Sequence, residues 1–176
     1  MSDRLSRRRY VAGTGAALAL GTLAGCSGGG GGGDGGDGSD GSDGGSGGAG
    51  EALDDVPSEI DDYLADARMY EGTIADYTGQ DEVTVAVGAG DIGYAFDPPA
   101  IRIDSSTTVV WEWTGQGGAH NVASVEASES DFNSGNAVAE EGTTFEQSFD
   151  NTGIQLYQCT PHQANGMLGA IEVVEA

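Results

Sequence analysis

From residue 83 onward, the 176-residue chain is a succession of short segments rich in β-branched and aromatic residues. Gly, Asn, Asp and Pro separate these segments, and little helical periodicity lies between them. Strands that follow one another without helices favour a β-sandwich or barrel over an alternating βαβ fold. We therefore predict an all-β domain of about seven strands, at residues 83–87, 100–103, 107–113, 120–125, 143–149, 154–159 and 170–174.

Residues 51–80 precede this region and have a different pattern. Ser58 followed by Asp61 resembles a helix-capping signature. The apolar residues with helical spacing here are Ile60, Tyr63, Leu64 and Ala67. We predict a short helical lead-in within residues 51–80, packed on a β domain at residues 81–176.

The amino terminus has the organisation of an export signal. Adjacent arginines at positions 7–9 precede residues 11–24, an apolar stretch shorter than the ~20 residues that span a bilayer. Residues 6–11, SRRRYV, resemble the twin-arginine signal, and residues 23–26, LAGC, resemble a lipobox. We predict a twin-arginine lipoprotein signal peptide at residues 1–25 and lipidation of Cys26, which would anchor the protein at the extracellular face of the cell membrane.

Residues 26–50 behind this cysteine consist almost entirely of Gly, Ser and Asp, and offer nothing for a hydrophobic core. A flexible chain of this composition has an r.m.s. end-to-end distance of roughly 27 Å over 24 residues. We predict that residues 26–50 are a tether between the lipidated cysteine and the folded domain.

Acidic residues dominate the charge of the chain. After residue 25, 28 acidic residues face only Arg68 and Arg102, a net charge of −26. Such a chain lacks the basic face that nucleic acid requires, so we expect no nucleic-acid partner. Dense carboxylates are typical of a surface hydrated in concentrated salt, and a docking face for a basic partner is the alternative. At ~1 M salt the Debye length is ~3 Å, so this charge would steer partners weakly.

Cys159, His162 and Met167 lie within nine residues, and His120 is the other histidine of the chain. If Cys26 is lipidated, Cys159 is the remaining thiol, in an oxidising compartment where unpaired thiols are uncommon. Each residue alone fits core packing or a plain loop. Together, one thiolate, two imidazoles and one thioether are the ligand set of a blue-copper electron-transfer site. Zinc is the main alternative metal, although it rarely binds thioether sulfur.

The motifs around these residues resemble a known family. Residues 118–122, GAHNV, followed by CTPH at 159–162 and GM at 166–167, resemble the cupredoxins with plastocyanin-like loop spacing, and most closely the halocyanins. The resemblance covers residues 83–176 and implies a Greek-key cupredoxin β-sandwich of about seven to eight strands. It also implies one copper ion that cycles between Cu(I) and Cu(II). The equatorial ligands would be His120, Cys159 and His162, with Met167 as the axial ligand.

The resemblance further implies a role for Asn121, which would tie the first-histidine loop to the cysteine loop by hydrogen bonding. The exposed edge of His162 is the expected electron port, and the residues around it are Gly117, Gly118, Ala164 and Leu168. Plastocyanins have a tyrosine immediately before the ligand cysteine. Here Gln158 stands at that position and Tyr157 falls on the opposite strand face, so the second electron route of plastocyanins is in doubt.

The expected function is that of a monomeric, membrane-tethered type 1 copper protein. It would shuttle single electrons between membrane redox complexes, such as a terminal oxidase, and would not be an enzyme. Copper delivery or storage is the alternative, but one Cys and one nearby Met make a poor match to the open, sulfur-rich site that delivery requires. A cysteine hydrolase would need a base, an orienting group and an oxyanion hole that the sequence does not indicate. A purely structural surface domain would not require this ligand set.

Overall fold

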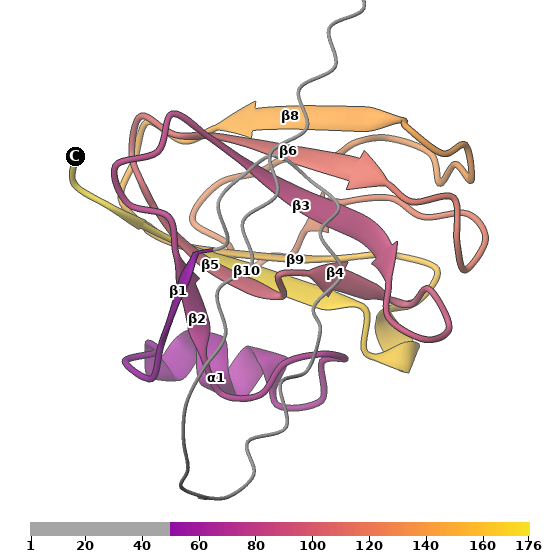
Figure 1. Cartoon of the computed structure of the whole chain (residues 1–176), viewed down its shortest axis with the longest axis horizontal. Helices are drawn as coiled ribbons and strands as arrows, with labels where there is room; N and C mark the ends of the chain where they lie inside the picture. The colour runs from indigo at the N-terminus through magenta and orange to yellow at the C-terminus, as the bar shows by residue number, and fades with distance from the viewer. Residues whose placement is uncertain (1–49) are drawn as a thin grey trace, which may run out of the picture. The chain divides into compact units, whose positions relative to one another are not determined.

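In the computed structural model, which describes residues 50–176, ten strands form two sheets (Figure 1). The strand order is β1-β2-β5-β10-β9-β7 in the six-stranded sheet and β4-β3-β6-β8 in the four-stranded sheet. The predicted all-β sandwich with a short helix before it is therefore confirmed. The predicted signal peptide at residues 1–25, Cys26 and the predicted tether up to residue 49 lie outside the described residues.

The strands are β1 (Glu51–Leu53), β2 (Ile74–Asp76), β3 (Glu82–Ala89), β4 (Ala95–Asp97), β5 (Ala100–Asp104), β6 (Thr108–Trp113), β7 (Ala123–Ser124), β8 (Thr144–Ser148), β9 (Gly153–Gln158) and β10 (Leu168–Val174). The helix α1 spans Ser58–Leu64, and a 3₁₀ turn, η1, spans Gln163–Asn165. Each of the seven predicted strand segments overlaps one strand. The three strands without a predicted counterpart, β1, β2 and β4, have three residues each.

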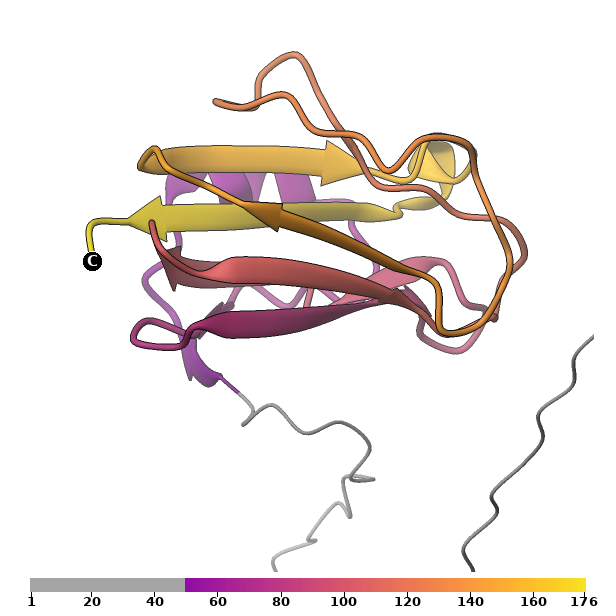
Figure 2. The same cartoon turned by 90° about the horizontal axis from the view of Figure 1, so that it is seen from above.

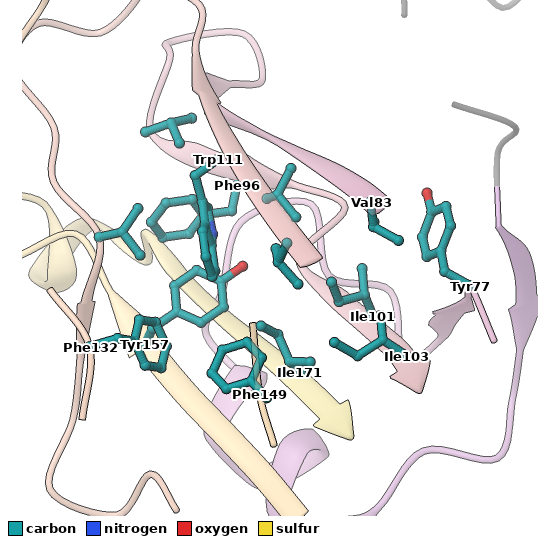
Figure 3. Close-up of a cluster of buried hydrophobic side chains, with 14 of the residues drawn as sticks. Tyr77, Val83, Phe96, Ile101, Ile103, Trp111, Phe132, Phe149, Tyr157 and Ile171 are labelled. Carbon is teal, nitrogen blue, oxygen red and sulfur yellow. The ribbon is translucent and has the colours of Figure 1, made fainter. Parts of the chain in front are cut away.

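The main hydrophobic core lies between the two sheets (Figure 3). Strand β3 contributes every second residue, beginning with Val83, because alternate side chains of a strand point to the same face. Aromatic rings fill the middle of the core. Trp111 of β6 meets Tyr157 of β9 edge to face, with ring centroids 5.4 Å apart. Cys159 and Met167 belong to the same buried cluster, so two of the predicted copper ligands lie at the border of the core.

A second apolar cluster lies on the outer face of the six-stranded sheet, where α1 packs (Figure 1). Ile60 and Leu64 of α1 are fully buried against Leu156 of β9 and Ala170 of β10. These two central strands are thus covered on both faces. No helix among residues 50–176 has the length and apolar character needed to cross a membrane.

Strands β6 and β9 end at the same end of the sandwich, and the loops that follow them lie there side by side (Figure 2). The loop after β6 leads to His120. The loop after β9 contains Cys159 and His162, passes through η1 and enters β10 at Leu168. This arrangement brings residues 39 to 42 positions apart in the sequence into contact.

Candidate metal centre

Three side chains converge between these loops, and all three were predicted from the sequence. The Sγ atom of Cys159 lies 3.6 Å from Nδ1 of His120 and 3.5 Å from Nδ1 of His162. The two Nδ1 atoms are 3.1 Å apart. Within residues 50–176, this trio is the metal-type cluster of His, Cys, Asp and Glu side chains that the structure brings together.

The ring of His120 is held in the tautomer that leaves Nδ1 free. Its Nε2 lies 2.7 Å from the carbonyl oxygen of Gln116, and because a carbonyl only accepts, Nε2 must carry the proton. The lone pair of Nδ1 is therefore free to bind a metal ion together with Cys159 Sγ and His162 Nδ1. Burial lowers the pKa of His120, and the nearby His162 lowers it further, against the opposing effect of the Gln116 hydrogen bond. The neutral imidazole is the form that binds a metal ion.

The loop from Cys159 to Met167 is closed by its own backbone. The Cys159 N–H donates to the Met167 carbonyl at 3.0 Å, and the His162 N–H donates to the Cys159 carbonyl at 3.0 Å.

Burial raises the pKa of the Cys159 thiol, while N–H groups of Asn121 and His162 act in the opposite direction. Met167 is fully buried directly before β10, in the same apolar cluster as Cys159. The sulfur of Cys159 thus needs a cation beside it to remain a thiolate at neutral pH.

Asn121 links the two donor loops. Its Oδ1 accepts the Thr160 N–H at 2.8 Å, and its Nδ2 donates to Thr160 Oγ1 at 3.2 Å and to the Gly135 carbonyl at 3.3 Å. The side chain is almost fully buried. One amide therefore joins the residue after His120 to the residue after Cys159.

Trp113 makes a contact that the sequence did not indicate. Its indole Nε1–H donates a hydrogen bond to the carbonyl oxygen of His120 at 3.1 Å. This core residue therefore also holds the backbone of a predicted metal ligand in place. A tryptophan in a strand pattern predicts core packing, and nothing in its spacing predicts a hydrogen bond seven residues along the chain.

Tyr94 is a second residue that sequence reasoning missed. Its ring stacks on the imidazole of His162, with centroids 4.2 Å apart and planes inclined by 20°. The set of residues that the sequence predicted around His162 therefore omitted Tyr94, which is larger than any of them. Gly117 and Leu168 are half-buried, and Gly118 and Ala164 are exposed. No local motif marks Tyr94. It lies directly before β4 of the four-stranded sheet, and only the packing of the two sheets brings it beside His162 in the loop between β9 and β10.

Tyr157 belongs to the hydrophobic cluster between the two sheets. It is fully buried, and Gln158 on the other face is half-buried. The ring of Tyr157 is therefore not exposed at the surface beside Gln158.

The chemistry of the donors fits copper. A metal with bonds of roughly 2.0–2.3 Å to nitrogen and thiolate sulfur spans donor separations of the size seen here. One thiolate and two imidazoles, with a buried thioether at the end of the same loop, is a set that favours copper over zinc. The locked tautomer of His120 is the arrangement that supporting hydrogen bonds give to metal-binding histidines.

The chain is similar to copper proteins over this region and beyond it. The family model of copper-binding proteins of the plastocyanin/azurin family matches residues 82–174. Halocyanin of Natronomonas pharaonis is 57% identical over 169 residues, which is 96% of this chain and 98% of that protein. Chloroplastic plastocyanin of Pisum sativum is 31% identical over 99 residues, covering 52% of this chain and 58% of that protein. The solved structure of a mutant fern plastocyanin aligns with a TM-score of 0.44 at 20% identity, over 52% of this chain and 100% of that one.

The matched range contains all three converging donors and Met167. The cofactor is accordingly a single copper ion. With a family match that spans the donor loops and a relative that is similar along nearly the entire chain, the protein belongs to the plastocyanin/azurin family of copper-binding proteins, alongside halocyanin.

Proposed function

We propose that the chain is a one-electron carrier whose copper is held by His120, Cys159 and His162 as equatorial ligands and by Met167 as the axial ligand. The observation that carries this proposal is the convergence of two Nδ1 atoms and one Sγ at 3.1 to 3.6 Å, with the His120 tautomer fixed by Gln116. A carrier of this kind is not an enzyme, because it transforms no substrate.

When bound, copper supplies the Cu(I)/Cu(II) couple. The task of the protein is to keep the donor atoms in place while the charge of the site changes. Asn121, Trp113 and the Gln116 carbonyl restrain the loops and the His120 ring from three directions. Burial of His120 and Cys159 excludes water from their side of the site.

The route for electrons is the half-buried imidazole of His162 together with the ring that covers it. Tyr94 lies in stacked contact with this imidazole and is itself half-buried. A partner that touches this face would therefore meet Tyr94, and Gly118 and Ala164, which the sequence predicts near His162, are both exposed.

The first test is optical. The protein is mixed with Cu(II) in concentrated salt, and the visible spectrum is recorded for the natural chain, for Cys159→Ser and for Cys26→Ser. We expect an intense blue band that disappears on reduction, returns on oxidation and is absent only in Cys159→Ser. A colourless protein that binds Cu(I) would instead favour copper delivery or storage, and a protein that retains zinc and ignores copper would refute the carrier.

The proposal for the cellular setting rests on the sequence pattern of the amino terminus. We propose a twin-arginine lipoprotein signal at residues 1–25, a lipid on Cys26, and a tether from residue 26 to 50 that holds the domain at residues 81–176 and its lead-in at 51–80 near the outer face of the membrane. The partners would be membrane redox complexes that donate and accept electrons, among them a terminal oxidase, and the carrier would act as a monomer. The pattern of residues 6–26 supports this proposal.

Cell fractionation tests the anchor. The natural protein is expected in the membrane fraction with the mass of an acylated chain, and Cys26→Ser is expected in the soluble fraction with its copper site intact. A Cys26→Ser protein that still fractionates with membranes would rule out the lipid as the anchor.

A further inference from the structure

A segment outside the range of the family match lies against the copper loop. Residues 63–68, here called the arm, include the end of α1 and the turn after it. Three hydrogen bonds join the arm to the ligand region. Tyr63 Oη donates to the Tyr157 carbonyl at 2.9 Å, the Arg68 N–H to the Gly166 carbonyl at 2.9 Å, and Arg68 Nε to the Asn165 carbonyl at 2.8 Å.

The acceptors bracket the predicted ligands. Tyr157 is two residues before Cys159, and Asn165 and Gly166 lie between His162 and Met167. Carbonyls at the end of η1 have no partner within that short turn, so a donor from elsewhere is needed to order them. Arg68 of the arm supplies two such donors, its backbone N–H for the Gly166 carbonyl and its Nε–H for the Asn165 carbonyl.

Gly166 allows the arm to come this close. It adopts φ +81°, the left-handed conformation that ends η1. A Cβ at this position would also collide with the carbonyl oxygen of Asp66. The same glycine thus ends the turn and makes room for the arm.

The arm has a rigid base. Ile60 and Leu64 of α1 are fully buried against β9 and β10, the two strands that flank the copper loop. A displacement of the loop relative to these strands would therefore strain the arm's hydrogen bonds, because the burial of Ile60 and Leu64 holds α1 on the strands.

We propose that the arm is a positioning element for the copper loop, and that the Nε–H of Arg68 is its decisive donor. This inference rests on the proposed copper site, since the arm would act through His162 and Met167. It predicts that the donor at the Nε position matters and that the positive charge does not. Arg102, the other arginine of residues 50–176, pairs with Glu172 at 2.6 Å, whereas the contact of Arg68 Nε is a neutral carbonyl.

Two substitutions separate the donor from the charge. Arg68→Gln places an amide nitrogen at the same distance along the side chain as Nε and removes the charge. Arg68→Met places a methyl group there and also removes the charge. Both variants keep the backbone N–H that bonds to Gly166.

The first measurement is amide hydrogen exchange by NMR in the copper-free natural chain and both variants. In Arg68→Met we expect the amides of Cys159, Gly166 and Met167 to exchange about tenfold faster, the factor that loss of one hydrogen bond of ordinary strength gives. In Arg68→Gln we expect rates within about twofold of the natural chain, because a neutral donor retains most of the bond. Amides of β3 should exchange equally in all three proteins. Unchanged loop exchange in Arg68→Met, or equal acceleration in both variants, would overturn the proposal.

The second measurement uses the copper-loaded proteins and asks whether the arm does more than stabilise the fold. We expect Arg68→Met to change the reduction potential and the energy of the blue band, and Arg68→Gln to restore both values. Faster loop exchange with an unchanged potential and spectrum would reduce the arm to a structural brace and refute its positioning role. If the natural chain shows no blue band at all, the copper site itself fails, while the exchange data still decide whether the arm holds the loop.

Discussion

Asn121 offers the sharpest test of how the two donor loops are held together. Replacing it with alanine removes the 2.8 Å bond from the Thr160 N–H and the two longer bonds from Nδ2. The short bond is worth about 1–1.5 kcal/mol and the two long ones about 0.5 kcal/mol each, because hydrogen bonds weaken as they lengthen. Asn121→Ala should therefore lower the free energy of unfolding by about 2–2.5 kcal/mol.

Thermal unfolding of the copper-free protein measures this loss. For a domain of this size, 1 kcal/mol corresponds to about 4–5 °C, so the melting temperature should fall by about 10 °C. Thr160→Val is the matched control, since it removes only the Oγ1 acceptor of one long bond and should cost about 0.5 kcal/mol. The double variant should cost about as much as Asn121→Ala alone, because the Oγ1 bond is already lost in that variant.

Copper affinity provides the second readout. Residues that orient metal ligands typically change affinity by ~10–100-fold when removed, so Asn121→Ala should bind Cu(II) at least about tenfold more weakly. A variant that melts within about 2 °C of the natural chain, or a Thr160→Val variant as unstable as Asn121→Ala, would show that Asn121 does not couple the loops.

Three further predictions concern the surroundings of the site. A methyl group at Gly169 would collide with the ring of Tyr157 on the neighbouring strand, so Gly169→Ala should cost about 1–3 kcal/mol in urea unfolding, and a loss below about 0.5 kcal/mol would contradict this packing. The stack of Tyr94 on His162 should give a coupling of about 1 kcal/mol in a double-mutant cycle of copper-free Tyr94→Leu and His162→Leu, and a coupling near zero would refute the contact. Burial raises the pKa of Tyr63 to about 12, so the folded state retains a proton that the unfolded state loses above its ordinary pKa of 10.0. Stability should fall as the pH rises from 10 toward 12, and Tyr63→Phe should flatten that part of the curve in denaturant titrations; an unchanged slope would contradict the assignment.

The β-sandwich could be predicted from the sequence because its strands carry their own signals. The segment at residues 83–87 alternates strictly, and β3 indeed buries Val83, Val85 and Val87 in one face. Three-residue strands carry no such signal. Strands β1 and β2 exist because Ile74 pairs with Leu53 and Ala75 pairs with Ile101 of β5, and these partners lie 21 and 26 residues away. Residues 51–80 therefore contain one helix and two strands where the sequence pattern indicated only the helix.

The donor trio could also be predicted, since thiol and imidazole groups are rare in this chain and two of the three lie within one loop. The residues that surround the trio could not. Tyr94 reaches His162 from the residue directly before β4, and Arg68 reaches Asn165 from the turn after α1, 97 positions away. Both are ordinary residues in their local sequence, and only the packing of the sheets and of α1 brings them to the loop.

The hydrogen bonds around the trio explain why this fold suits a one-electron carrier. His120 is restrained at its ring by Gln116 and at its carbonyl by Trp113, and Cys159 is restrained by the Met167 carbonyl. These bonds come from different elements, so no single movement of a loop or strand releases all the donors. If copper binds here, a change of its charge would meet ligands that these bonds hold in place, and its two oxidation states would have nearly the same geometry. Copper delivery would require the opposite, a loop that opens to release its metal. The restraints on this loop therefore favour an electron carrier.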